Sequence, residues 1–202
     1  MKKALIAILV IFIIFLIIGI TFVTKYITFY NKANKLKVKI ENNWSEVENQ
    51  YKRRYDLIPN LVQTVKGYAE HEKQTFQAVT EARSKVGGVI NISKDILDNP
   101  ELFQKYQRAQ NSLANALQRL MVVKERYPEL KANQNFLRLQ DELAGTENRI
   151  AVARKRFNES VSKYNELLVV FPNNFYADLA NMEKAEFFKA PEESKEAPKV
   201  EF

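Results

Sequence analysis

Residues 50–72 read QYKRRYDLIPNLVQTVKGYAEHE and place Pro59 and a cluster of charges inside a long helical pattern. From Trp44 onward, apolar residues recur at alternating steps of three and four, which is the spacing of one face of an α-helix. The phase is the same on both sides of the proline. We therefore predict one long helix that is kinked at Pro59. A second helix that opens there, with Asp56 as its N-cap, is the alternative.

The first helical pattern is expected to end at Gly87-Gly88, and a linker follows it. Asn99-Pro100 then has the order of a capping residue followed by proline, which is typical of the first turn of a helix. A second apolar stripe continues from there to Tyr127, again in steps of four and three. The sequence therefore predicts a second long helix after the linker.

The third helical pattern is the longest and runs from Phe136 to Phe171. Pro172 is expected to stop it and to permit one short helix afterwards. The apolar residues on one face of that short helix are Phe175, Leu179 and Met182. Amphipathic helices cannot bury their stripes alone, and packing against one another is the usual solution. The sequence therefore predicts an all-α fold, an antiparallel bundle of three to four long helices.

A stretch of 20 residues at positions 4–23, ALIAILVIFIIFLIIGITFV, carries no charge. A helix of that length spans roughly 30 Å, the thickness of the hydrocarbon core of a membrane. The alternative is a cleaved signal peptide, which the Lys2-Lys3 start resembles. The apolar run is longer than the ~7–15 residues usual in signal peptides, and no small-residue cleavage site follows it. We therefore predict an uncleaved transmembrane helix.

Charge is distributed unevenly along the chain. The chain carries 31 Lys and Arg and 24 Asp and Glu, and its first 40 residues hold seven lysines and no acidic residue. The remaining 24 basic residues therefore balance the 24 acidic ones. A neutral body with a basic collar is typical of a protein at a membrane surface and excludes the basic face of a nucleic-acid binder. Contact with the bilayer surface is expected from Lys25, Lys32, Lys35, Lys37 and Lys39.

The same lysines bear on orientation. Two lysines precede the predicted span and five follow it, so the positive-inside rule favours a cytoplasmic body. A signal-anchor start followed by a translocated domain would give the reverse. The predicted organisation has four parts: the anchor over residues 1–24, a basic juxtamembrane segment over 25–40, the helical bundle over 41–188, and a charged, proline-bearing mobile tail over 189–202.

Residues that carry chemistry are few. The chain has no cysteine, which excludes disulfides, thiolate metal sites and cysteine nucleophiles. His71 is the only histidine, and Tyr68 stands three residues before it, where a di-iron carboxylate site needs a glutamate. No phosphate loop, calcium loop or nucleophile elbow occurs. We expect no catalytic residue, metal or cofactor. The one cluster left for an enzyme is Glu70, Glu72, Tyr68 and Arg53.

Arg54 falls on the apolar stripe, where an unpaired charge would cost several kcal/mol. The third helical pattern offers polar partners at its edge, and Glu147 is the acidic residue among them. We predict a polar network between helices that joins Arg54 or Asp56 to that group and fixes the helix register. Solvated charges beside a kink are the alternative. The candidate residues are Arg53, Arg54, Asp56, Pro59, Asn60, Glu147, Arg149, Arg154 and Asn158.

Several long motifs stand out in this chain: NNWSEVENQYKRRYDLIPNLVQTVKGYAEHE at 42–72, TEARSKV at 80–86, RYPELKANQNFLRLQDELAGTENRIAVARKRFNESVSKYN at 126–165, and the ending APKVEF. Together they resemble the LemA family of bacterial membrane proteins. The resemblance covers nearly the whole chain. It implies an all-α bundle carried on a single N-terminal span in a bacterium, and it implies no activity.

Two functions remain after these exclusions. The first is a non-enzymatic, membrane-anchored scaffold or assembly protein of the bacterial cell (inner) membrane, whose neutral body permits a homo-oligomer. An unidentified membrane or envelope protein is a further partner to expect. The second is a membrane-linked signalling or regulatory module in which the kink at Pro59 moves, because polar clusters beside helix breaks are typical of two-state elements.

Overall fold

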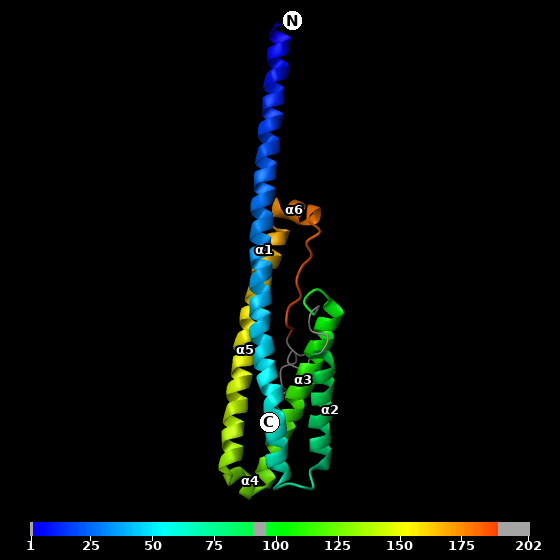
Figure 1. Cartoon of the computed structure of the whole chain (residues 1–202), viewed down its shortest axis with the longest axis vertical. Helices are drawn as coiled ribbons and strands as arrows, with labels where there is room; N and C mark the ends of the chain where they lie inside the picture. Colours follow the sequence, from blue (N-terminus) through cyan, green and yellow to red (C-terminus); the bar gives the residue numbers. More distant parts are fainter. Residues whose placement is uncertain (1, 91–95, 190–202) are drawn as a thin grey trace, which may run out of the picture. The chain divides into compact units, whose positions relative to one another are not determined.

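A computed structural model of the chain describes residues 2–90 and 96–189, which form helices and connecting segments without a strand (Figure 1). The all-α prediction is confirmed for this part of the chain. The helices are α1 (Lys2–Lys66), α2 (Lys73–Ile90), α3 (Pro100–Val123), the 3₁₀-helix η2 (Lys124–Arg126), α4 (Pro128–Ala132), α5 (Gln134–Val169) and α6 (Asn173–Leu179). Apart from Lys189, the predicted mobile tail lies outside the described residues.

α1 is one helix of 65 residues that contains both the apolar stretch and Pro59. The predicted anchor and the predicted first bundle helix are therefore parts of one element. The helix continues through the exposed Pro59, so a second helix opening at Asp56 is wrong. Ile58 and Leu61 are buried on either side, and their packing holds the helix where proline removes one backbone hydrogen bond. A kink at Pro59 stays a prediction.

The first break after α1 lies at residues 67–72, so the prediction that the first helix ends at Gly87-Gly88 is wrong. The turn begins at Gly67, whose N–H donates to the Gln63 carbonyl at 3.2 Å, and it continues with the Ala69 N–H donating to Val65 at 2.9 Å. The apolar phase is unchanged across this turn, which is why periodicity alone did not indicate it. Apolar residues of the one predicted pattern are buried in both α1 and α2.

Gly87 serves close packing rather than helix termination. It lies inside α2, and a Cβ at this position would be 3.2 Å from the Tyr55 hydroxyl of α1. A larger side chain would therefore press on α1. By contrast, the predicted start of the second helix is confirmed: the Asn99 side chain accepts from the N–H groups of Glu101 and Leu102 at 3.0 and 3.1 Å, and Pro100 occupies the first turn.

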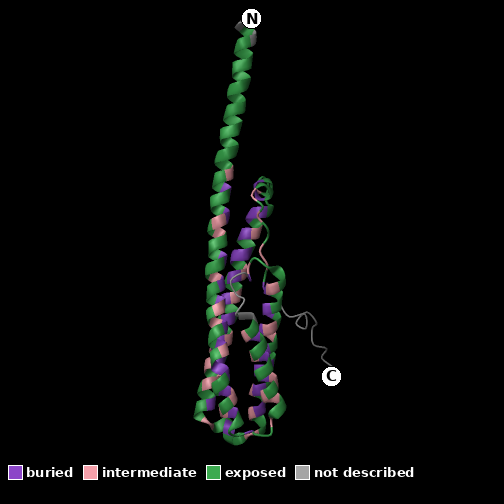
Figure 2. Ribbon diagram, turned by 45° about the vertical axis from the view of Figure 1, so that its right-hand side comes forward, coloured by how far each residue is buried: buried purple, intermediate pink, exposed green. Residues whose placement is uncertain are grey.

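Residue contacts divide the chain into two units. Unit 1 comprises Met1–Ile40 and Ser160–Lys184, and unit 2 comprises Glu41–Glu159 and Ala185–Phe202. In unit 2, successive long helices alternate in direction (Figure 1). Buried apolar side chains from α1 to α5 form its core (Figure 2). Part of the predicted stripe belongs to this core, namely Ile58, Leu61, Val65, Val79, Ala82 and Val86.

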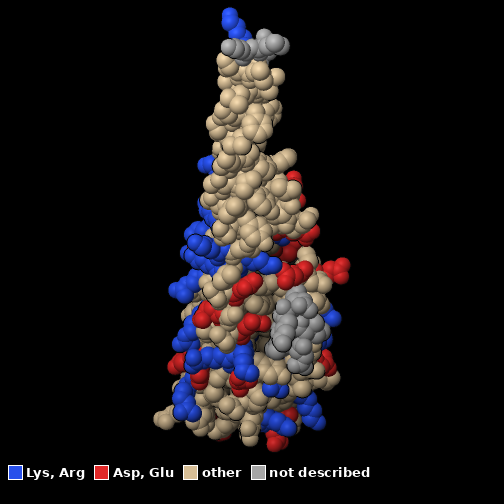
Figure 3. All heavy atoms as spheres, turned by 45° about the horizontal axis from the view of Figure 1, so that its top comes forward, with Lys and Arg blue, Asp and Glu red and all other residues tan. Residues whose placement is uncertain are grey.

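Unit 1 contains the apolar stretch, along which no side chain of the described residues between Leu5 and Val23 is buried. Figure 3 shows this part of α1 as a surface without charged atoms. Within the described chain, α1 is the one helix long and apolar enough to cross a membrane, by length and composition. It is therefore a candidate membrane span.

The residues that are buried on the short helix α6 are not the ones predicted. Tyr176 and Ala177 are buried, whereas Phe175 and Leu179 are 63% and 57% exposed. The predicted apolar face of Phe175 and Leu179 is therefore not a core face. The reason is local: α6 has only seven residues and rests on α1 through the ring of Tyr176, which is one position on from Phe175 and thus about 100° around the helix.

Candidate functional site

Arg54 is the centre of the polar interior of unit 2. Its side chain is 2% exposed, although it carries a permanent charge. One terminal nitrogen donates to both carboxylate oxygens of Glu147 on α5, at 3.0 and 3.2 Å. The other terminal nitrogen donates to the backbone carbonyl of Gln110 on α3, at 3.1 Å, and to its side-chain oxygen. We call these three residues the Arg54 site. It joins three helices through one guanidinium.

The surroundings of Arg54 explain how a charge is accommodated there. The guanidinium lies 5.0 Å from the ring centre of Tyr51, one turn earlier on α1. Glu147 is 39% exposed at its side chain, so the carboxylate keeps contact with water while it pairs with the buried arginine. A buried charge is tolerated when it is paired and hydrogen-bonded. The site therefore links α1, α3 and α5 in unit 2 through a buried charge.

Arg53 makes a second ion pair with α5 in a different environment. Its guanidinium donates to Glu142 at 2.9 Å, and the two side chains are 49% and 38% exposed. Exposed pairs of this kind contribute about 0–1 kcal/mol to stability. Arg53 therefore adds to the polar contacts of α1 without being buried with Arg54.

Asn158 and Arg154, the other candidates on α5, hold an extended segment that follows α6. The Asn158 side chain accepts from the Phe188 N–H at 2.9 Å and donates to the Phe188 carbonyl at 3.0 Å. Arg154 donates to the Lys189 carbonyl at 3.3 Å and lies over the Phe188 ring at 4.7 Å. The residues predicted as one network therefore take part in three contacts: the Arg54 site, the pair of Arg53 with Glu142, and the contact with Phe188.

Phe188 completes an aromatic cluster formed with Trp44, Phe103, Tyr106 and Phe157. Trp44 is at its centre, with ring-centre distances between 5.5 and 5.9 Å to the other four rings. Aromatic pairs at such separations gain about 0.5–1.5 kcal/mol beyond the burial of their area. The segment that carries Phe188 is thus fastened both by ring packing and by backbone hydrogen bonds to Asn158.

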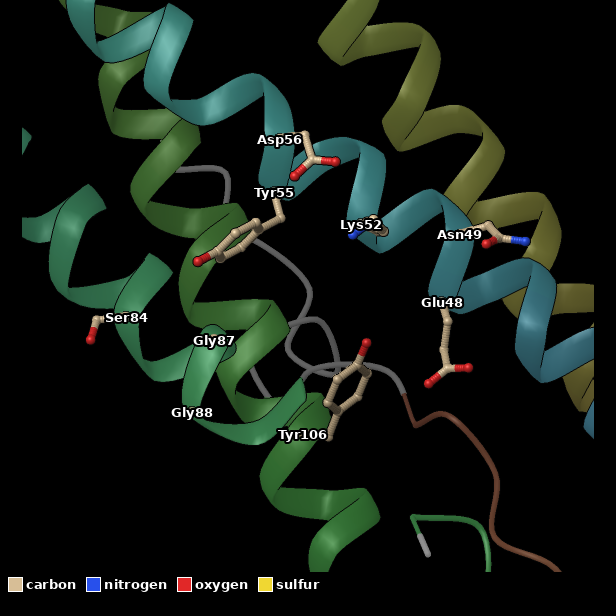
Figure 4. A pocket seen from close by; sticks show the side chains of 9 residues that line it. All are labelled: Glu48, Asn49, Lys52, Tyr55, Asp56, Ser84, Gly87, Gly88 and Tyr106. Carbon is tan, nitrogen blue, oxygen red and sulfur yellow. The ribbon is translucent and has the colours of Figure 1, made fainter. Parts of the chain in front are cut away.

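A cavity of about 680 Å³ opens between α1, α2 and α3 (Figure 4). Its size is within the range of small-molecule sites. Partial burial raises the pKa of the Glu48 carboxyl, and a hydrogen bond from the Trp44 side chain opposes that rise. Burial also raises the pKa of the Tyr106 hydroxyl, with Tyr51 adding to the rise and a hydrogen bond with Gln110 opposing it. The lining residues are Glu48, Asn49, Lys52, Tyr55, Asp56, Ser84, Gly87, Gly88 and Tyr106.

The remaining predicted residues lie apart from the Arg54 site. Asp56 is exposed and lines the cavity, so it is Arg54 and not Asp56 that reaches α5. Asn60 is exposed, and its backbone carbonyl accepts a hydrogen bond from the Thr64 hydroxyl at 2.8 Å. Arg149 is exposed beside a shallow groove on α5. The lysines predicted at the membrane surface are all exposed on α1: Lys25, Lys32, Lys35, Lys37 and Lys39.

The sequence did not indicate the α3 partner of Arg54. Gln110 is 1% exposed, and Gln107, three residues earlier, is 8% exposed and donates to the Lys189 carbonyl. The available signal was a pair of glutamines three residues apart between the apolar Tyr106 and Leu113. Such a pair on the inward face of a helix indicates internal hydrogen bonds.

The contacts of Arg54, Arg53 and Asn158 join segments of unit 2. Among the described residues, no group of three or more His, Cys, Asp and Glu is placed to hold a metal ion. A model of the LemA family matches residues 43–202. The chain belongs to the LemA family. The LemA match includes the Arg54 site and the aromatic cluster, and it begins after the apolar stretch. No curated protein matches the sequence.

Proposed function

We propose that the protein is a membrane-anchored helical scaffold of the bacterial cell envelope, that it self-associates, and that it has no catalytic activity. The observation that carries this proposal is the unburied apolar stretch of α1, a candidate membrane span in the same chain as a helical body of the LemA family. An anchor of this kind keeps whatever the body binds at the membrane. Attachment to a membrane suits an assembly role.

The polar groups of the body support a structural role. Arg54 and Asn158 each use their hydrogen bonds to join segments of this chain. Two members of the cluster considered for an enzyme, Tyr68 and Glu72, are engaged in the same way at the turn after α1. Glu72 accepts from Arg126 at 2.9 Å and from the Tyr127 hydroxyl at 3.2 Å. Each of these side chains therefore has a hydrogen-bond partner within the chain that accounts for its position.

The chain has no cysteine, so a single introduced cysteine can be used to test on which side of the membrane the body lies. We expect the body in the cytoplasm, on the inner membrane, because five lysines follow the apolar stretch and two precede it. A single cysteine at the exposed Gln77 of α2 would then react with a membrane-impermeant maleimide only after cell lysis. Reaction in intact cells would place the body outside and reverse the orientation.

Self-association is tested with mixed isotopes. Ordinary and ¹⁵N-labelled full-length chains are reconstituted together in lipid vesicles and treated with a lysine-reactive crosslinker. Crosslinked peptides that combine one labelled and one unlabelled partner can form only between two copies. The control combines separately reconstituted vesicles. If only same-isotope pairs appear and the detergent-extracted chain is monomeric, the scaffold proposal in its self-associating form is wrong.

A regulatory module is the second candidate, and the position of the cavity favours it. Tyr55 and Asp56 line the cavity one turn before Pro59. Pro59 has no N–H to give to the Tyr55 carbonyl, so the helix lacks one hydrogen bond beside the cavity. Replacing Pro59 by Ala should slow amide exchange around residues 55–63 and change a cellular output at unchanged protein level. Unchanged exchange would remove the basis for a movable kink.

A further inference from the structure

A group of exposed apolar side chains lies on α6 and on the residues just before it. Phe171 is 83% exposed, and Val169, Val170, Phe175 and Leu179 are between 49% and 63% exposed. We call these five residues the α6 foot. Several adjacent apolar side chains left in water mark a surface that is covered by something else. The fold does not need them inward, because Tyr176 and Ala177 already form the buried face of α6.

The structure fixes the level of α6 along α1. The Tyr176 ring lies 5.3 Å from the Phe22 ring, 6.0 Å from the Tyr26 ring and 5.8 Å from the Phe29 ring, measured between ring centres. All these residues belong to unit 1. The uncharged stretch ends at Val23, so Phe29 is six residues, or about 9 Å, beyond it. α6 is therefore held beside the end of the candidate span.

That level corresponds to the interfacial layer of a bilayer. The polar layers add roughly 5–8 Å on each side of the hydrocarbon core, and amphipathic helices lie at about this depth. Aromatic side chains are favoured there, and Tyr26, Tyr30 and Tyr176 occur together at this level. α6 also has a polar side: Asn174 and Asp178 are exposed and lie about 100° around the helix from Phe175 and Leu179.

We propose that the α6 foot inserts into the interfacial layer of the leaflet in which α1 leaves the membrane, and so forms a second membrane contact of the protein. This inference rests on the proposed anchoring of α1. Lipid fits better than a second copy of the chain, because a stable protein interface takes roughly 20–30 residues a side and the foot has five. The foot fixes the rotation of α1 about its own axis, which a single span leaves free.

The test uses three single-cysteine variants of the full-length chain, each labelled with an environment-sensitive fluorophore in vesicles. F175C reports the foot. I13C reports the apolar stretch, and V38C is the matched control, because Val38 is an exposed apolar residue of unit 1 that lies about 22 Å beyond Val23. Quenching is measured with nitroxides carried on the lipid headgroup, high on the acyl chain or near its end, and with a water-soluble quencher.

We expect lipid-borne nitroxides at the headgroup and upper chain to quench the F175C label several-fold more than the V38C label, and the I13C label to be quenched from deeper positions. If I13C is quenched by lipid while F175C behaves like V38C, the foot is in water and the inference is wrong, although the anchor stands. If I13C is not quenched by lipid, the anchoring proposal and the inference are both wrong. If the F175C label is shielded from lipid and water alike, protein covers the foot and the inference is overturned.

Discussion

Arg53 and Arg54 are neighbours on α1, and each pairs with a glutamate of α5 over nearly the same distance, 2.9 and 3.0 Å. The difference lies in their surroundings. The Arg53 side chain is 49% exposed, whereas the Arg54 side chain is 2% exposed and also bonds Gln110 of α3. Water can replace the partner of the first arginine but not that of the second. Burial, rather than distance, therefore decides which pair the fold depends on.

The largest effect is expected from removing the buried arginine. R54A should lower the free energy of unfolding by about 3–5 kcal/mol, because it empties a packed site and leaves Gln110 without its charged partner. The measurement is urea unfolding of the full-length chain in detergent micelles, followed by the fluorescence of Trp44, the only tryptophan. R54K serves as the control for charge, since lysine cannot reach both partners as a fork. If R54A lowered the free energy of unfolding by only about 1 kcal/mol, as expected for an exposed pair, burial would not distinguish Arg54 from Arg53.

Coupling within the Arg54 site is measured in the same assay. E147A leaves the buried guanidinium without its carboxylate, so that R54A and E147A remove the same contact. The double variant should therefore lose clearly less stability than the two single losses added together. Strict additivity would mean that the pair seen in the structure contributes nothing to the fold.

Alkaline pH offers a second way to separate the two surroundings, because the buried phenols of Tyr51 and Tyr106 lie near Arg54. Burial raises the pKa of both Tyr51 and Tyr106. Unfolded tyrosine ionises near pH ~10, so above that pH the folded chain binds more protons than the unfolded one. Stability should be complete below about pH 10 and fall above it, by up to about 1.4 kcal/mol per pH unit for each tyrosine.

The variant Y106F isolates one of these phenols. Its stability, measured by urea unfolding at a series of pH values, should fall less steeply above about pH 10 than that of the parent chain. Y30F, which changes an exposed tyrosine of unit 1, is the matched control. Equal slopes for all three chains would show that Tyr106 titrates in the folded protein as it does in the unfolded one.

The sequence predicts the Arg54 contact because both signals are local: a charge stands on an apolar stripe, and Glu147 stands at the edge of another stripe. It does not predict the partner on α3, because a glutamine is polar enough for either a buried or a solvated position. The Phe188 contact also escapes prediction, since the atoms that Asn158 bonds are backbone atoms 30 residues away and carry no side-chain signature.

The same reasoning explains the two errors in the helices. Periodicity reports which residues face inward, and this was right on both sides of the turn at 67–72, where Ile58, Leu61 and Val79 are all buried. It does not report where the chain reverses if the apolar pattern has the same phase before and after the turn. On α6, a face shared by Phe175 and Leu179 indicated burial, but a periodic apolar face can equally meet lipid.

Asn158 is an intermediate case between the two arginines, because it is partly buried and bonds backbone groups. N158A should cost about 1–2 kcal/mol, the value of hydrogen bonds whose buried partners are left unsatisfied. The loss should be local: Phe188 would leave Trp44, and Trp44 emission would shift to the red with greater acrylamide quenching. The exposed Asn148 on the same helix provides the control N148A, which should change neither. If Trp44 emission and acrylamide quenching were unchanged in N158A, Asn158 would not be needed to hold Phe188 against Trp44.

The smallest effect is expected at Arg53. R53A should lower stability by no more than about 1 kcal/mol, because both members of the pair regain water when it breaks. The effect should vanish in about 1 M salt, where the screening length is only about 3 Å, whereas the loss in R54A should persist, since the buried pair is screened much less. Unfolding both variants at low and high salt therefore compares the two sites directly. If R53A were as costly as R54A and equally resistant to salt, adjacency to the buried site, rather than burial itself, would account for both.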